Sequence, residues 1–228
     1  MANKIRVVCA TRLGEADFWA KSALGRSLTH YRLPFIDLRL FAQNSRGLST
    51  VYNIAIDESL KDPAVLVFLH DDAHLCDFYW FDYLLNALAV FDVVGLAGNR
   101  RRLPRQPAWS FIDERFTWDA PQNLSGIVGH GRGFPPAQIS FYGPPRQEVK
   151  LLDGLMLVAR SETLHSRQLR FDERFAFHFY DMDFCRQAEV LGLKMGTWSI
   201  SIVHESGGNF GAESWRQAYA TYLQKWTE

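Results

Sequence analysis

The feature that most constrains the fold is a five-residue apolar run, Val65–Leu69, which is followed at once by His70, Asp71 and Asp72. A run without polar alternation is typical of a strand covered on both faces, as in the parallel sheet of an α/β protein. Polar residues directly after such a strand lie at the carboxyl edge of the sheet, where open α/β folds bind ligands. The run therefore predicts both a fold class and the place of a site.

The rest of the chain supports an α/β fold, because short β-rich runs alternate with amphipathic stretches. Strands are expected at Ile5–Cys9, Phe35–Phe41, Val65–Leu69, Val93–Ala97, Leu151–Arg160 and Thr197–Val203. Helices are expected at Asp17–Leu24, Leu48–Ser59, Phe78–Phe91, Asp181–Leu191 and 212–226. Strands and helices alternating at this pace predict a mostly parallel central sheet flanked by helices.

Residues 99–150 break the alternation. Seven of the nine prolines lie there, and a structureless connection of that length is uncommon. We interpret the segment as a Pro/Gly-rich insert of loops and short strands, for example at 137–142, within a single domain spanning 1–228. Its basic cluster, Arg100–Arg102, fits a solvated loop better than a phosphate site.

Charge and composition exclude some classes of partner. Lys+Arg and Asp+Glu both number 25, which argues against a nucleic-acid binder or a binder of anionic membranes. No apolar run approaches the roughly 20 residues of a transmembrane segment, and no signal peptide is present. The three cysteines lack the spacing of a zinc site or a redox pair. We therefore expect a protein of a reducing compartment, the cytoplasm.

The paired carboxylates of Asp71 and Asp72 can both face one cavity if the chain turns at the strand end. Two carboxylates in a dry site need a compensating cation, and a divalent metal with oxygen ligands supplies it. The alternative is an ordinary cap of the helix near Phe78. His204 ends the last expected strand and is placed at the same rim.

Other polar residues follow the first two strands. Thr11 and Arg12 come after the first, while Asn44 and Gly47 lead into a helix after the second. The free N–H groups at the start of that helix suit an anion or a base edge.

A second acidic pair, Asp181 and Asp183, lies in the segment FHFYDMDFCRQA at the start of an expected helix. Capping explains one such residue. The surrounding aromatic side chains also desolvate a carboxyl group, which raises its pKa and makes it suitable as a general base near neutral pH.

Taken in order, these motifs resemble the GT-A glycosyltransferases, in particular the family 2-like group. The segments that carry the resemblance are NSRGLSTVYNIAI, VLVFLHDDAHL, LLDGLMLVAR, FDERFAFHFYDMDFC and ISIVHESGG. The HDD segment is similar to the DxD-type signature of these enzymes, and FYDMDFCRQA is similar to their acidic "ED" helix motif, with Tyr180 in place of the glutamate.

The resemblance implies a GT-A, nucleotide-diphosphosugar transferase-like fold and a role for each site residue. Asp72 and His204 would hold a divalent metal, Mn²⁺ or Mg²⁺, and Asp71 would contact the ribose or the metal. Asp181 would be the base, with Asp183 sharing or taking that role. The nucleoside would be surrounded by Thr11, Arg12, Asn44, Gly47 and Asn53, and the sugar and acceptor would be bordered by Asp153 and Gly154.

The function implied is metal-dependent transfer of a sugar, of hexosyltransferase type and inverting, from a nucleotide-diphosphosugar to a saccharide or other hydroxyl acceptor. The insert at 99–150 would lie on the acceptor side. Two alternatives stay open: a metal-dependent phosphohydrolase using Asp71, Asp72, Asp183 and His204, and a sugar-nucleotide binding module without catalytic activity.

Overall fold

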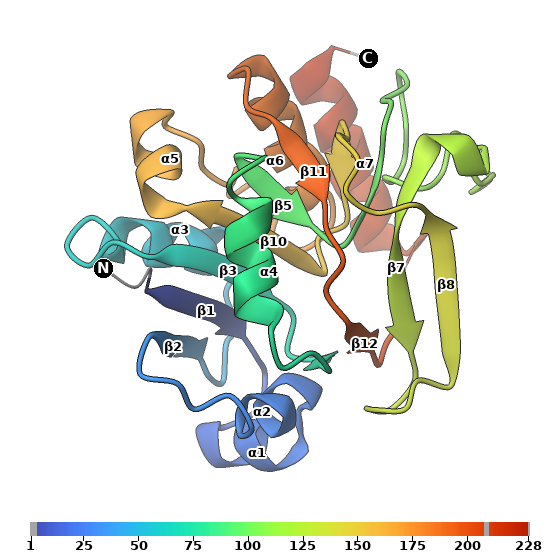
Figure 1. The fold of residues 1–228 in the computed structure, drawn as a ribbon. Coiled ribbons are helices and arrows are strands. Elements are labelled where there is room, and N and C mark those ends of the chain that lie inside the picture. Colours follow the sequence, from blue (N-terminus) through green and yellow to red (C-terminus); the bar gives the residue numbers. More distant parts are fainter. Residues whose placement is uncertain (1–3, 208–209, 228) are drawn as a thin grey trace.

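The computed structural model describes residues 4–207 and 210–227, which form two sheets and surrounding helices (Figure 1). Sheet A contains, in spatial order, β11 (Met195–Thr197), β5 (Val93–Gly95), β10 (Met156–Arg160), β3 (Val65–Leu69), β1 (Ile5–Ala10) and β2 (Ile36–Phe41). Sheet B contains β4 (Ala73–Leu75), β12 (Ile202–His204), β7 (Leu124–His130), β6 (Ala97–Asn99) and β9 (Leu151–Leu152), with β8 (Gln138–Gly143) paired to β7.

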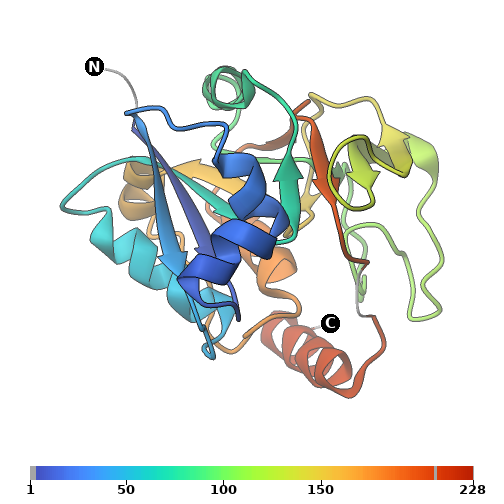
Figure 2. The same cartoon turned by 90° about the horizontal axis from the view of Figure 1, so that it is seen from below.

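The helices are arranged around sheet A. They are α1 (Glu15–Lys21), α2 (Ala23–Leu28), α3 (Leu48–Glu58), α4 (Trp80–Ala87), α5 (Ser161–Ser166), α6 (Tyr180–Val190) and α7 (Glu213–Trp226), with a 3₁₀ turn at Pro121–Asn123. Figures 1 and 2 show α4 on one face of sheet A and α3, α6 and α7 on the other. No helix in the described ranges is both long and apolar enough to cross a bilayer.

Sheet A confirms the predicted architecture, with one strand reversed. β3 is buried along its whole length and lies next to β1, to which it is parallel. β10 is antiparallel to both of its neighbours, β3 and β5, and its first residue, Met156, pairs with the last residue of β3, Leu69. The residues just before β10 therefore lie at the same edge as the residues just after β3.

Three segments predicted as continuous strands are each divided between the two sheets, and in that respect the predictions are wrong. Val93–Ala97 leaves sheet A after β5 and enters sheet B as β6. Leu151–Arg160 is interrupted between β9 and β10, and Thr197–Val203 between β11 and β12. The first two segments are apolar on both sides of the bend, and the third alternates polar and apolar residues across it. A hydrophobicity pattern therefore does not reveal where the chain changes sheet.

The insert at 99–150 builds much of sheet B rather than lying as loops along an edge. β8 forms near the expected strand, and it pairs with β7, which the sequence pattern missed. Two glycines in β7 obscured its strand character. Gly126 is required there, because its φ is 115° and a Cβ atom would lie 2.1 Å from the Leu96 carbonyl oxygen of the adjoining β6 segment.

The start of the insert is held by a buried carboxylate. Asp119 accepts hydrogen bonds from Asn99 at 2.9 Å and from Arg101 at 2.5 and 2.9 Å. Burial acts to raise the pKa of Asp119, but the hydrogen bonds from Arg101 and Asn99 outweigh it and hold that pKa well below its usual range. Arg102 pairs with Glu189, so two members of the arginine cluster make structural ion pairs.

The predicted helix Asp17–Leu24 is in fact two short helices. Ser22 ends α1, donating its hydroxyl to the Phe18 carbonyl, and it begins α2 by accepting a hydrogen bond from the Gly25 amide at 2.9 Å. Serine is a favoured N-cap because its side chain satisfies an amide that has no partner within the helix. The capping residue therefore explains the break.

Candidate active site

A cleft of about 490 Å³ opens where the two sheets meet. It is formed by the segment after β3, the segment before β10, the first turn of α6, the end of β12 and part of the insert. Its polar lining includes His70, Asp71, Asp72, His130, Asp153, Asp181, His204 and Ser206. Its aromatic lining includes Tyr52, Trp109, Phe111, Trp118, Tyr142, Phe177, Phe179, Tyr180, Phe210 and Trp215. Six of the twelve sequence-predicted site residues thus share one cleft: Asp71, Asp72, Asp153, Gly154, Asp181 and His204.

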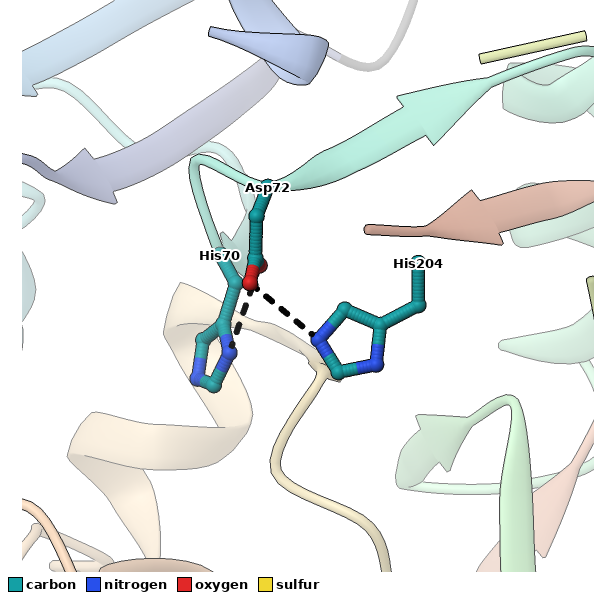
Figure 3. Close-up of side chains that lie close together, drawn as sticks. All are labelled: His70, Asp72 and His204. Atoms are coloured by element: carbon teal, nitrogen blue, oxygen red, sulfur yellow. Dashed lines mark ion pairs between the residues drawn. The ribbon is translucent and has the colours of Figure 1, made fainter. Parts of the chain in front are cut away.

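Three side chains at one end of the cleft could hold a metal ion. Donor atoms of His70, Asp72 and His204 all lie within 4.8 Å of one another. The His204 Nε2 atom is 3.4 Å from Asp72 Oδ2, and the His70 Nδ1 atom is 3.9 Å from Asp72 Oδ1 (Figure 3). Figure 3 shows the two imidazole rings on either side of the carboxylate, which turns its oxygens toward both.

The carboxylate of Asp72 is held in its charged form. Burial acts to raise its pKa, but hydrogen bonds with His204 and Ser206 outweigh that effect and lower the pKa of Asp72 to about 2. Ser206 donates its hydroxyl to Oδ2 at 2.5 Å, while the other oxygen, Oδ1, is buried and makes no hydrogen bond within the described residues. A buried anionic oxygen without a donor is the kind of atom that a cation satisfies.

The two histidines have opposite electrostatic environments. Burial lowers the pKa of His70, because it disfavours the imidazolium form, although the charge of Asp72 partly opposes the shift. Burial acts in the same direction on His204, but its hydrogen bond with Asp72 outweighs it and raises the pKa of His204. His70 is therefore a neutral imidazole at neutral pH, which is the form that binds metals.

Asp181 lies in the first turn of α6 and lines the same cleft. Its Oδ2 accepts a hydrogen bond from the Gly154 amide at 3.1 Å, and its Oδ1 accepts one from its neighbour's amide, Met182 N–H, at 2.8 Å. Burial, with a further contribution from the charge of Asp153, raises the pKa of Asp181 to about 7. A half-buried carboxyl group with that pKa can accept a proton near neutral pH.

The orientation of α6 depends on the residue before it. Phe179 has a left-handed backbone with φ of 65°, which is rare for a bulky residue. Its ring is packed among the α7 side chains Trp215, Tyr219 and Tyr222, with centroid separations of 5.2 to 5.4 Å. This packing holds the sharp turn that directs Tyr180 and Asp181 toward the cleft.

The insert supplies an aromatic wall to the cleft. The rings of Trp118 and Tyr142 are stacked with centroids 5.9 Å apart, and Trp109 meets Tyr142 edge to face at 5.0 Å. The indole N–H of Trp109 donates to Asp153 Oδ2 at 2.6 Å, which holds the Asp153 carboxylate next to these aromatic rings. Trp118 is 53% exposed and so offers a free ring face.

Two residues after the first and third strands contact each other directly. The Thr11 hydroxyl donates to Asp71 Oδ2 at 2.5 Å, so Thr11 reaches the rim of the cleft through Asp71. Arg12 is exposed and is not part of the lining within the described residues.

Asn44, Gly47 and Asn53 have structural roles that differ from the predicted contact with a nucleoside. Asn44 closes a turn on the backbone of Arg46. The helix start at Gly47 is closed against Ala176: the Leu48 amide donates to the Ala176 carbonyl, and a Cβ atom on Gly47 would lie 2.8 Å from the Ala176 Cα. Asn53 is 5% exposed and holds the Phe171 backbone with two hydrogen bonds.

Asp183, the second residue that the sequence offers as a catalytic base, lies away from the cleft. It is fully buried, and its Oδ1 is 2.6 Å from Lys225 Nζ and 2.9 Å from Trp226 Nε1. It is not among the described residues that line the cleft. Positions two apart on a helix point in different directions, so Asp183 faces α7 while Asp181 faces the cleft.

Several lining residues were missed by the sequence reasoning. His70 was expected at this edge but was given no role as a ligand. That role could have been found, because His70 precedes Asp72 by two positions and alternate residues of an extended chain share a side. Ser206 and Trp109 carry no comparable local signal. Their place depends on how β12 and the insert fold back over the end of β3.

Comparisons with known proteins agree with this architecture. No protein-family model and no curated protein sequence matches the chain. Among solved structures, the chain is similar to the catalytic domain of Drosophila β1,4-galactosyltransferase 7, solved in complex with xylobiose. The TM-score is 0.55 and the identity 8%, with 96% of this chain and 80% of that chain covered.

The chain has a GT-A fold. A197 from STIV also matches, at 14% identity with a TM-score of 0.49, over 90% of this chain and 86% of that chain. At 8% identity the similarity to the galactosyltransferase domain describes the fold, and the chemistry has to be argued from the side chains in the cleft.

Proposed function

We propose that this protein is a divalent-metal-dependent glycosyltransferase that moves a hexosyl group from a nucleotide-diphosphosugar to an acceptor hydroxyl, with inversion. The observation that carries the proposal is the presence, in one cleft of a GT-A fold, of the His70–Asp72–His204 cluster and of Asp181 with a pKa of about 7. Narrower membership of the family 2-like group rests on the sequence motifs alone.

The metal would be held by Asp72 and His204, as the sequence indicates, together with His70. The fit is supported by the buried Asp72 Oδ1, which has no hydrogen-bond partner among the described residues, and by the proximity of two imidazoles. When bound, the metal supplies Lewis-acid stabilisation of the negative charge that develops on the departing nucleoside diphosphate. Two nitrogen donors favour Mn²⁺ over Mg²⁺, which prefers oxygen ligands and retains its waters.

Asp181 would accept the proton of the acceptor hydroxyl as that oxygen attacks the anomeric carbon. The amides of Gly154 and Met182 each bind one carboxylate oxygen, so the group is oriented before the substrate arrives. Each oxygen has a further lone pair with which to accept the proton. Its raised pKa makes it a stronger base than an ordinary aspartate.

The acceptor would bind against the wall formed by Trp109, Trp118 and Tyr142, which places the insert on the acceptor side. Flat aromatic faces suit the apolar faces of sugar rings, and Asp153 beside the wall can accept a hydrogen bond from a sugar hydroxyl. The nucleotide would lie at the opposite end, near Asp71 and Thr11.

The two alternative functions are less well supported. The phosphohydrolase model used Asp183 as a ligand, and that residue is engaged by Lys225 instead. A binding module without catalysis has no use for a carboxyl group whose pKa is raised to about 7 inside the cleft.

The test is a product assay with a panel of nucleotide-diphosphosugars, Mn²⁺ and saccharide acceptors, preceded by thermal-shift screening of nucleoside diphosphates with and without Mn²⁺. We expect transfer that depends on both metal and acceptor. Release of free sugar or phosphate without an acceptor would instead indicate a hydrolase. Metal-dependent binding without any turnover would indicate a binding module.

A further inference from the structure

A buried tyrosine connects the metal cluster to the backbone of the catalytic cleft. Tyr180, the first residue of α6, is 4% exposed, and its hydroxyl lies 2.8 Å from the Nε2 atom of His70. The same hydroxyl donates a hydrogen bond to the Gly154 carbonyl oxygen at 2.7 Å. In the motif resemblance Tyr180 only takes the place of a glutamate, whereas its contacts in the structure indicate a role of its own.

The direction of these hydrogen bonds determines which nitrogen of His70 carries a proton. A phenol has one hydrogen to donate, and the carbonyl of Gly154 can only accept. Because Tyr180 gives its hydrogen to Gly154, its oxygen has to accept one from His70. The neutral imidazole is therefore protonated at Nε2, and Nδ1 has a free lone pair.

That lone pair points toward the metal cluster. Nδ1 of His70 is the atom 3.9 Å from Asp72 Oδ1, the buried oxygen that makes no hydrogen bond within the described residues (Figure 3). Two acceptor atoms thus face each other with no proton between them. A cation can bind both, whereas the other tautomer would place an N–H group there and close the position.

We propose that Tyr180 is a positioning residue that, anchored on the Gly154 carbonyl, holds His70 in the Nε2–H tautomer and so makes Nδ1 the third protein ligand of the metal. This inference rests on the metal centre of the proposed function and adds the hydrogen bond that fixes the tautomer of its ligand His70. Hydrogen bonds of this kind orient metal-binding histidines and set their tautomer.

Gly154 contributes to the same arrangement because it has no side chain. A Cβ atom built there would lie 2.4 Å from the Tyr180 hydroxyl oxygen and 3.1 Å from the Asp181 Cβ. Only a residue without a side chain allows the carbonyl to meet Tyr180 while the amide of the same residue meets Asp181. One residue thus orients both the metal ligand and the proposed base.

The first experiment measures binding of Mn²⁺ alone, from the electron paramagnetic resonance signal of the free ion, in the wild-type protein and in Tyr180→Phe. We expect a 10- to 100-fold loss of Mn²⁺ affinity, the usual effect of removing such a hydrogen bond. The matched control is Tyr52→Phe. Tyr52 is buried in the same aromatic cluster, with its ring centroid 6.0 Å from that of Tyr180, and its hydroxyl has no partner among the described residues. We expect this control to keep wild-type affinity.

The second experiment uses the metal-free wild-type protein and does not depend on whether a variant folds. Long-range ¹H–¹⁵N spectra of the histidine side chains, assigned with His70→Gln, should show His70 as the Nε2–H tautomer. An Nδ1–H tautomer, or equal Mn²⁺ affinity in folded Tyr180→Phe and wild type, overturns the role of Tyr180 and leaves the metal centre standing. No Mn²⁺ binding by the wild type overturns both.

Discussion

Asp181 and Asp183, two positions apart on α6, point to opposite sides of the helix and meet entirely different partners. The first accepts hydrogen bonds from backbone amides in the cleft, and the second is paired with Lys225 of α7. The resemblance names Asp181 as the general base, with Asp183 sharing or taking that role. Their separation by the helix is consistent with the proposed chemistry of Asp181 and a structural role of Asp183, and it allows the two roles to be tested independently.

Replacing Asp181 by Asn should reduce kcat by a factor of about 10²–10⁴, because the amide cannot take the proton of the attacking hydroxyl. The affinity for Mn²⁺ should not change, since the side chain does not belong to the metal cluster. Steady-state transfer assays and Mn²⁺ titration measure the two effects. Wild-type kcat in this variant would remove Asp181 from the mechanism.

The transfer rate should rise with pH through about 7. Burial and the nearby charge of Asp153 raise the pKa of Asp181 to about 7, so the carboxyl group is protonated and inactive as a base below that pH. The logarithm of kcat should fall by one unit per pH unit on the acid side. The same shift makes Asp181 a destabilising contributor above its unfolded pKa, so its contribution to stability decreases as pH rises toward 7 and levels off above. A flat profile from pH 5 to 8 would contradict the assignment.

Replacing Asp183 by Ala should destabilise the protein by on the order of 1–3 kcal/mol, because Lys225 loses one of its two carboxylate partners and the indole N–H of Trp226 loses its acceptor. Lys225 keeps its ion pair with Asp172 at 2.7 Å. Denaturant unfolding measures the loss. The control is Asp57→Ala, which breaks an exposed ion pair with Arg170 and should cost less than about 1 kcal/mol. The folded fraction of the Asp183 variant should retain metal binding.

Mn²⁺ should raise the melting temperature of the wild-type protein more than Mg²⁺ does at the same concentration, because two of the three donors are imidazole nitrogens. Saturation at a hundredfold excess over Kd corresponds to about 2.7 kcal/mol of stabilisation. Asp72→Ala should abolish this stabilisation. An unchanged response in that variant would place the metal elsewhere.

Replacing Trp118 by Ala should raise the KM for a saccharide acceptor about 3- to 10-fold, because it removes a stacking face that is worth roughly 0.5–1.5 kcal/mol. The KM for the donor should be unaffected. Phe134→Ala is a suitable control, since Phe134 is another exposed aromatic residue of the insert and does not contribute to the described lining. Equal effects of the two substitutions would argue against an acceptor site at the wall.

The sequence predicted the parts of the site that follow directly from strand ends. The apolar run of β3 located Asp72, because ligands bind at the carboxyl edge of such a sheet. His204 was expected at the same rim and lies there for another reason: β12 belongs to sheet B, where His204 pairs with Ala73, the residue after Asp72. Asp153 and Gly154 were placed only through the family resemblance. The structure explains their position, because β10 is antiparallel and its start coincides with the end of β3.

The parts that the sequence did not predict depend on contacts between distant segments. Asn53 has a residue type suited to nucleotide binding, but the Phe171 backbone occupies its amide. The role of Tyr180 requires knowing that His70 and Gly154 approach it from two other segments. Such contacts leave no periodicity or spacing in the chain, so a pattern-based interpretation has no access to them.

The three backbone segments that leave one sheet and enter the other have a consequence for cooperativity. Neither sheet has a complete set of strands without residues 93–99, 151–160 and 195–204, each of which hydrogen-bonds in both. Unfolding of either sheet therefore removes strands from the other. We expect calorimetry to record one transition whose van't Hoff and calorimetric enthalpies agree. The two sheets that border the cleft should unfold together rather than move as independent rigid bodies.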